Sequence, residues 1–233
     1  MGEAVQVWRV PLLISDQAIA RYAKCLSADE RARADRFRFE ADRRKFVVAR
    51  GTLRHLLGKR FGCAAGAIAF CYSKYGKPET SADPSGYSFH FNLSHSGEIA
   101  LCALGGDRTV GIDIEKVKPI QRLDSLLERC LVAREKAIVK SQPIEQQPSA
   151  FLQHWTCKEA YLKAIGLGLS QSMTTVEVDL NPAPFDSPRF VHVPDECAAG
   201  WQLHRIAVPE TYVAALVVAG ESAVDVKDWQ HSD

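Results

Sequence analysis

Several features that would assign a chain to a specialised class are missing from this sequence. Within its 233 residues, no window approaches the roughly 18 consecutive apolar residues of a transmembrane helix. The N-terminus, MGEAVQVWRVPLLISDQ, has no basic stretch followed by a sustained apolar run, which argues against a secretory signal. The sixth position also lacks the Ser or Thr of a myristoylation site. These absences favour a cytoplasmic protein that has no membrane partner.

Other absences exclude whole kinds of site. The seven cysteines are scattered and form no CxxC pair, so neither a disulfide framework nor a zinc site is indicated. The G-x-S-x-G elbow of the α/β-hydrolases does not occur. The net charge is only +1, which is low for a protein that binds nucleic acid without sequence preference.

The charge that is present is unevenly placed. Between Arg21 and Arg60 there are thirteen Lys and Arg residues against five Asp and Glu residues. A basic segment in a nearly neutral chain is typical of a surface that attracts an anion. A solvated helix face with internal ion pairs would have the same composition, so composition leaves both interpretations open.

Hydrophobic periodicity predicts a mixed chain. Ser27 to Glu30 fits a capping box at the start of a helix near Ala28, and apolar residues at spacings of three and four predict a second helix from Phe46 to Gly62. The polar stretch from Tyr75 to Gly86 is expected to be a loop. Strands are predicted at 87–93, 99–104, 110–117, 174–180, 190–193, 202–208 and 212–219, and helices at 122–130, 133–140 and 148–165.

Two segments resemble each other in length and layout. Residues 87–106 and 201–220 each follow a helical stretch and read as a hairpin. This internal similarity favours an α+β fold of two similar subdomains, residues 1–108 and 109–233. We expect a ligand between them, because clefts between subdomains commonly bind ligands.

Three local motifs contain chemically useful residues. In Gly111-Ile-Asp-Ile-Glu115, both acids project from one face of a strand, since residues i and i+2 point the same way. Paired carboxylates of this kind suit Mg²⁺ together with substrate phosphates, although a solvated strand face is the more common origin of the bare pattern.

The second motif is a predicted helix, Trp155-Thr-Cys-Lys-Glu-Ala-Tyr-Leu-Lys163. Its positions 155, 159 and 163 stack at i, i+4 and i+8, and Lys158 lies beside them. An exposed ion pair is the simpler explanation, but the tryptophan and the Gly-x-Gly exit at Gly166 and Gly168 are costly choices for a merely solvated helix.

The third motif is Phe91-Asn-Leu-Ser-His-Ser96. Adjacent strand residues face opposite ways, so Ser94 and His95 cannot form a nucleophile and base pair. Either side chain could instead donate to a phosphate.

In the order FNLSHS, GIDIE and WTCKEAYLKAIGLGL, these motifs resemble the Sfp-type 4′-phosphopantetheinyl transferases. The resemblance implies an enzyme that moves the phosphopantetheine arm of coenzyme A onto a serine of an acyl or peptidyl carrier protein and releases adenosine 3′,5′-bisphosphate. It implies Mg²⁺ or Mn²⁺ as cofactor, and a monomer.

The resemblance also implies a role for individual positions. Asp113, Glu115 and Glu159 fall on the metal-binding acids, and Glu159 is also the expected general base. Lys163 falls on the lysine that meets the pyrophosphate. The positions expected to bind coenzyme A are Arg33, Arg44, Lys45, Lys77, Ser94, His95, Lys158 and Lys163.

Two positions depart from the family pattern, and two other functions remain open. Glu30 falls near the position where some members have a basic residue for the 3′-phosphate. Cys130-Leu131 replaces an aromatic pair that often precedes the position of Glu135.

A metal-dependent pyrophosphohydrolase of coenzyme A or nucleotides would use the same acids with water. A non-catalytic module that only docks carriers is the other alternative. The short trimeric holo-carrier synthases are disfavoured, since those chains are about half this length.

Overall fold

The computed structural model describes residues 3–80, 89–167, 171–180, 187–194 and 200–231. Gly168 of the Gly-x-Gly exit, Cys197 among the seven cysteines, and parts of the predicted 75–86 loop and 87–93 strand lie outside these ranges. No helix within them has the length and apolar character to cross a bilayer. The six cysteines that the ranges contain are all free.

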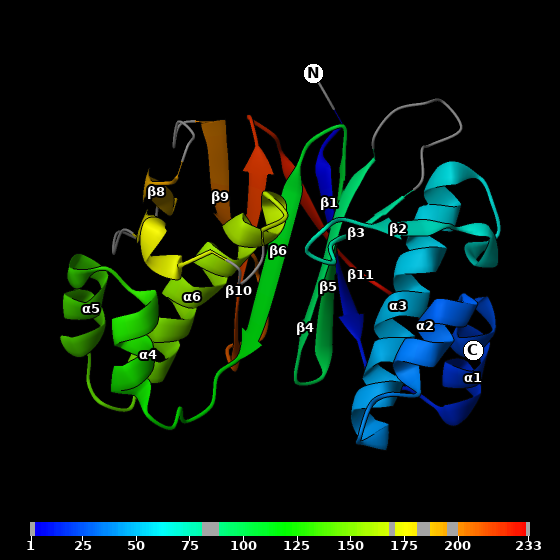
Figure 1. The fold of residues 1–233 in the computed structure, drawn as a ribbon, viewed down its shortest axis with the longest axis horizontal. Coiled ribbons are helices and arrows are strands. Elements are labelled where there is room, and N and C mark those ends of the chain that lie inside the picture. Colours follow the sequence, from blue (N-terminus) through cyan, green and yellow to red (C-terminus); the bar gives the residue numbers. More distant parts are fainter. Residues whose placement is uncertain (1–2, 81–88, 168–170, 181–186, 195–199, 232–233) are drawn as a thin grey trace.

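The fold has four layers, with two sheets in the middle and helices on both outer sides (Figure 1). One sheet has the strand order β11-β1-β5-β4 and the other β6-β10-β9. Two small hairpins, β2–β3 and β7–β8, complete the strands of the described ranges.

The elements of the first half end at the hairpin β4–β5. Their bounds are β1 Val5–Pro11, α1 Asp16–Cys25, α2 Ala28–Ala34, α3 Glu40–Phe61, the 3₁₀ turn η1 Ala65–Ala67, β2 Phe70–Tyr72, β3 Pro78–Thr80, β4 His90–Ser96 and β5 Ile99–Gly106. The capping box at Ser27 is confirmed, because the Ser27 amide donates to Glu30 Oε2 at 2.9 Å.

The second half repeats the same order of elements. Its bounds are β6 Val110–Lys116, α4 Leu123–Cys130, α5 Ala133–Lys140, α6 Gln147–Ala164, η3 Met173–Thr175, β7 Glu177–Asp179, β8 Arg189–His192, β9 Trp201–Arg205 and β10 Tyr212–Ala219. In both halves the first strand pairs antiparallel with the last, and the last two strands pair with each other. The predicted duplicated α+β unit is therefore confirmed.

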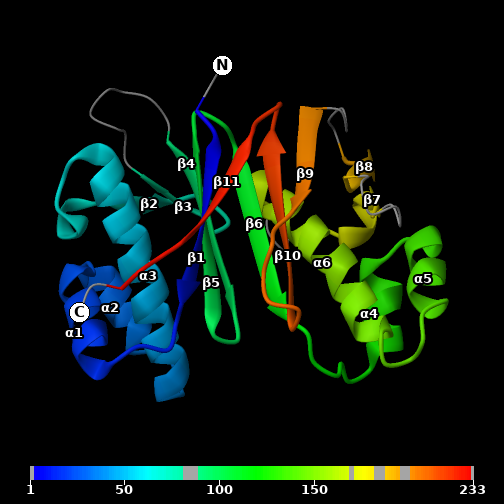
Figure 2. The ribbon, with the colours of Figure 1, turned by 180° about the vertical axis from the view of Figure 1, so that it is seen from behind.

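The strand β11, Val224–Asp228, has no counterpart in this repeat. It returns to the first half and pairs in parallel with β1, as Figure 2 shows from behind. The division after residue 108 stays a prediction, and this strand shows that the C-terminal segment contributes to the N-terminal sheet.

Three apolar clusters hold the layers together. One fills the space between α1, α2, α3 and the first sheet, and a second lies between α4, α5, α6 and the other sheet. The third lies where the two sheets face each other and includes the fully buried Ile112 and Ile114. The two halves are thus joined by an apolar seam to which β6 contributes Val110, Ile112 and Ile114.

Two sequence expectations were wrong in detail. The 75–86 stretch contains the strand β3, whose residue Thr80 pairs with Phe70. The predicted strand 174–180 begins with a 3₁₀ turn and is regular only from Glu177 to Asp179.

Candidate active site

The strand β6 presents its acids as the sequence predicts. Ile112 and Ile114 are fully buried in the seam between the sheets, and Asp113 and Glu115 share the other face. Asp113 is almost fully buried, with 4% of its surface exposed, and Glu115 is half-buried. A buried carboxylate needs hydrogen bonds or a cation, so its partners define the site.

Gly111 explains why this strand can lie so close to α6. A Cβ atom at this position would come within 2.0 Å of the Ala160 carbonyl oxygen and 2.4 Å of the Ala164 amide nitrogen. Only glycine therefore permits this backbone-to-backbone contact. The contact brings the acids of β6 next to the side chains of α6.

The strand β4 lies beside β6 across the seam and holds it through side chains (Figure 1). Asn92 Oδ1 accepts the Ile112 amide at 2.9 Å, and the Ser94 hydroxyl donates to Asp113 Oδ1 at 2.8 Å. The Ser96 hydroxyl donates to Glu115 Oε2 at 2.8 Å and accepts the Lys116 amide at 3.0 Å. Alternate residues of β4 thus hold β6, with Asn92 bound to its backbone and Ser94 and Ser96 bound to its two acids.

Two of the three β4 residues that bond to β6 were not predicted as site residues. The sequence pattern assigned a role to Ser94 but not to Asn92 or Ser96, although all three lie on one strand face at a spacing of two. It placed Ser94 and His95 on opposite faces, which is confirmed: Ser94 is buried against β6 and His95 is exposed.

Lys163 joins α6 to both strands. Its ammonium donates to Asp113 Oδ1 at 2.6 Å, to the Ser94 hydroxyl at 2.9 Å and to the Ile112 carbonyl oxygen at 3.3 Å. Its side chain stays 26% exposed. The cation is therefore held by the protein while its side chain stays accessible to solvent or a ligand.

Glu159 lies one turn before Lys163 on α6 and is 7% exposed. Burial raises the pKa of Glu159 to about 7; the positive charge of Lys163 opposes this rise, and the charges of Asp113 and Glu115 add to it. Burial also raises the pKa of Glu115, against a hydrogen bond from Ser96 that lowers it. The three acids thus influence one another.

A bound cation would fit two oxygens of this group. Asp113 Oδ2 and Glu159 Oε1 are buried and accept no hydrogen bond from protein. Such acceptors are costly to bury unless they meet a donor or a cation. No three His, Cys, Asp or Glu side chains of the described ranges converge as a ready metal-binding group, so the side chains as placed do not form the predicted three-acid set.

Lys158 does not face this site, and its prediction as a coenzyme A ligand is wrong. Its ammonium is fully buried and donates to Glu135 Oε2 at 2.5 Å, to the Cys130 carbonyl oxygen at 3.0 Å and to the Met173 carbonyl oxygen at 3.2 Å. The Lys158 side chain is 0% exposed, so a ligand cannot reach its ammonium. Adjacent helix residues point about 100° apart.

The basic residues predicted to bind phosphate differ in what they contact within the protein. Arg44 is paired with Asp16 at 2.5 Å, and Arg33 is exposed, with its guanidinium 5.5 Å from the centre of the Phe46 ring. Desolvation and the positive charges of Lys163, Lys45 and Arg33 lower the pKa of His95. The charges of Arg33, Lys45 and Lys163 thus all act on His95.

Comparison with known proteins agrees with this geometry. A family model described as the 4′-phosphopantetheinyl transferase superfamily matches residues 109–217, and one described as 4′-phosphopantetheinyl transferase, N-terminal, matches residues 14–105. The 4′-phosphopantetheinyl transferase HetI of Nostoc sp. is 38% identical over 94% of this chain and 90% of its own length.

Two further matches are more distant. The 4′-phosphopantetheinyl transferase Sfp of Bacillus subtilis is 28% identical over 78% of this chain and 77% of its own length. The crystal structure of a holo-(acyl-carrier-protein) synthase from Bacillus anthracis is 24% identical, has a TM-score of 0.39, and covers 49% of this chain and 96% of that one. The extended match to HetI and the two family models show that this chain belongs to the 4′-phosphopantetheinyl transferase family.

Proposed function

We propose that this enzyme transfers 4′-phosphopantetheine from coenzyme A to a serine of an apo acyl or peptidyl carrier protein. The observation that supports this most directly is the group of Asp113, Lys163 and Glu159, which lies where β6, α6 and β4 meet. It combines a fixed cation with a buried acid pair.

The reaction exchanges one phosphorus–oxygen bond for another. The carrier serine oxygen bonds to the phosphorus that bears the pantetheine arm, and the bond from that phosphorus to the bridging pyrophosphate oxygen breaks. Glu159, whose Oε1 receives no hydrogen bond from protein, takes the serine proton. Lys163 donates to the pyrophosphate and offsets the charge that develops on adenosine 3′,5′-bisphosphate as it leaves.

The proposal includes a divalent metal held by Asp113, Glu115 and Glu159. When bound, Mg²⁺ or Mn²⁺ would neutralise pyrophosphate charge, and the buried unpaired oxygens of Asp113 and Glu159 fit such an ion. Ser94 and Ser96 would keep two of these acids oriented from behind.

On the nucleotide side, we propose that Arg33, Lys45 and His95 meet the phosphates, because the positive charges of Arg33, Lys45 and Lys163 all act on His95. Arg44 would have to leave Asp16 to take part. Some family members have a basic residue near position 30 for the 3′-phosphate. Here that position is Glu30, which is buried and accepts a hydrogen bond from Arg54 at 2.6 Å, so it makes no contact with the nucleotide in this proposal.

We further propose that the enzyme acts as a monomer in the cytoplasm. The free cysteines of the described ranges suit a reducing compartment. Its macromolecular partner would be the carrier protein, with no nucleic acid or membrane involved.

The test is to incubate the enzyme with coenzyme A, Mg²⁺ and a panel of apo-carriers and to weigh the products. A carrier heavier by one phosphopantetheine group is the expected result. Free phosphopantetheine with unmodified carriers would identify a pyrophosphohydrolase instead. A carrier that binds while coenzyme A stays intact would identify a docking module.

A further inference from the structure

The turn between β2 and β3 is fixed by its own hydrogen bonds. The Gly76 amide donates to the Ser73 carbonyl oxygen at 2.9 Å, and the Ser73 amide donates to the Lys77 carbonyl oxygen at 2.9 Å. The Lys77 amide donates to the Ser73 hydroxyl at 3.1 Å, and Gly76 has φ of 81°, a conformation that favours glycine. The base of the Lys77 side chain is therefore held in place before any ligand binds.

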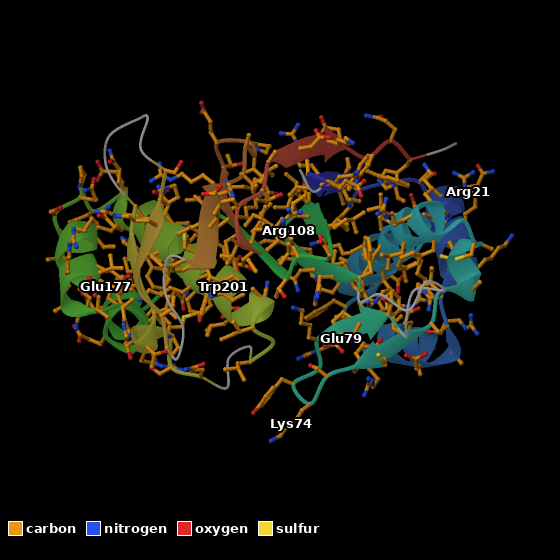
Figure 3. The ribbon with its side chains drawn as sticks, turned by 90° about the horizontal axis from the view of Figure 1, so that it is seen from above. Arg21, Lys74, Glu79, Arg108, Glu177 and Trp201 are labelled. Atoms are coloured by element: carbon orange, nitrogen blue, oxygen red, sulfur yellow. The ribbon has the colours of Figure 1, made fainter. Side chains whose placement is uncertain are left out.

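From this turn, the Lys77 side chain crosses to the other half of the molecule. Its ammonium donates to the Ala164 carbonyl oxygen at 2.8 Å and reaches the Val110 carbonyl oxygen at 3.5 Å. Ala164 is the last residue of α6, and Val110 is the first residue of β6. Figure 3 shows from above how the hairpin, with Lys74 and Glu79 labelled beside its turn, extends from the N-terminal half.

The carbonyl groups at the end of α6 show why this contact matters. The amides of Ile165, Gly166 and Leu167 donate to the carbonyl oxygens of Tyr161, Lys163 and Leu162 respectively. The carbonyl oxygen of Ala164, the last residue of the helix, accepts its hydrogen bond from the Lys77 ammonium. A cation at this point also complements the negative end of the helix dipole.

The same end of α6 carries the lysine of the active site. Lys163 directly precedes Ala164, and its ammonium is bonded to Asp113 and Ser94. The helix backbone touches β6 at Gly111, so a shift of its last turn would move Lys163 against the acids. Lys77 is half-buried, and this burial lowers the pKa of its ammonium.

We propose that Lys77 is a positioning residue, which fastens the β2–β3 turn to the C-terminal end of α6 and thereby places Lys163. This inference rests on the proposed transfer reaction for its effect on rate, but the contact itself can be tested without that reaction. The family resemblance implies that Lys77 contacts coenzyme A. In the present proposal, its ammonium instead binds the carbonyl oxygen of Ala164 within the protein.

The experiment compares Lys77→Met with Lys74→Met and Lys77→Arg. Lys74 lies on the same turn and is exposed, with its ammonium over the Tyr75 ring, so it controls for loss of charge. In the protein without substrates, hydrogen exchange of the amides in residues 162–167 should become faster in Lys77→Met only. Lys77→Arg can donate to the same carbonyls and should restore the slow exchange.

The rate measurement uses saturating coenzyme A and carrier. Lys77→Met should lose about tenfold in kcat, within the roughly hundredfold that a misplacement of 1 Å can cost. Its affinity for adenosine 3′,5′-bisphosphate should stay within about twofold of the parent, since the proposal assigns the ammonium no contact with the nucleotide. Lys77→Arg should recover most of the kcat.

Two results would overturn the proposal. Unchanged hydrogen exchange at the end of α6 in Lys77→Met would show that the contact does not hold the helix. An unchanged kcat with weakened binding of adenosine 3′,5′-bisphosphate would show that the ammonium serves the nucleotide. If the parent enzyme transfers nothing to any carrier, the transferase proposal fails, and the exchange experiment still decides the role of Lys77.

Discussion

Replacing Gly111 by alanine would test the close contact on which the site depends. The added Cβ would lie 2.0 Å from the Ala160 carbonyl oxygen, whereas real Cβ contacts are essentially never under 3.0 Å. The strand and the helix must therefore separate by about 1 Å, because the obstructing atoms are backbone. Overpacking of this kind costs about 1–3 kcal/mol in the free energy of unfolding.

The same separation should affect catalysis more than stability. Asp113 lies on the strand, and Glu159 and Lys163 lie on the helix, so a shift of about 1 Å should lower kcat roughly a hundredfold. Urea unfolding and steady-state transfer to a carrier measure the two effects. Gly66→Ala is the matched control, since Gly66 is exposed and a Cβ there would meet nothing closer than 4.0 Å. A Gly111→Ala enzyme that unfolds and turns over like Gly66→Ala would refute the reasoning.

Four further outcomes are expected. Glu159→Gln keeps the side-chain shape without its basicity and should lower kcat by about 10²–10⁴-fold, while a loss of only a few-fold at saturating Mg²⁺ would exclude it as the base. Excess chelator should abolish transfer, and added Mg²⁺ should restore it; activity that survives chelation would contradict the metal assignment. Lys158→Met leaves the buried Glu135 unpaired and should cost about 3–5 kcal/mol in urea unfolding, which an unchanged midpoint would disprove. Burial lowers the pKa of His154 to about 4, so the unfolded chain takes up a proton that the folded chain excludes. The free energy of unfolding should therefore fall as the pH drops toward 4, and a His154→Gln variant that shows the same fall would contradict this.

The parts of the site that sequence could predict are those with local periodicity. The spacing of two in Asp113 and Glu115 places them on one strand face, and the spacing of four in Glu159 and Lys163 places them on one helix face. The ladder from β4 to β6 was not predictable in the same way. It joins two strands of different sheets, so only the fold shows that Asn92 and Ser96 meet β6.

Long-range pairing explains the elements that were missed. The strand β11 has five residues and pairs in parallel with β1 from the other end of the chain, and no local pattern reports such a partner. The misassignment of Lys158 has another cause. Its neighbour Glu159 is in the site, but the direction of α6 relative to α5 decides which of the two side chains faces the acids.

The repeat of elements also repeats a buried charge. In the N-terminal half, Glu30 of α2 bonds to Arg54 of α3 at 2.6 Å, and Arg50 lies one turn earlier, with its Nε 3.2 Å from the same carboxylate. In the C-terminal half, Glu135 of α5 bonds to Lys158 of α6 at 2.5 Å, and His154 lies one turn earlier. Lys158 thus occupies a structural position that Arg54 fills in the other half.

This correspondence explains why the acids of the proposed metal site come from one half alone. Pro11 and Lys116 each pair with the first residue of the last strand in their half, so Trp8 corresponds to Asp113. Counting along the helices from Arg54 and Lys158, Lys59 corresponds to Lys163, and His55 to Glu159. The N-terminal half therefore has the lysine without the acids. The proposed divalent metal would depend on the acids of β6 and α6, and β4 of the N-terminal half supports this site through Asn92, Ser94 and Ser96.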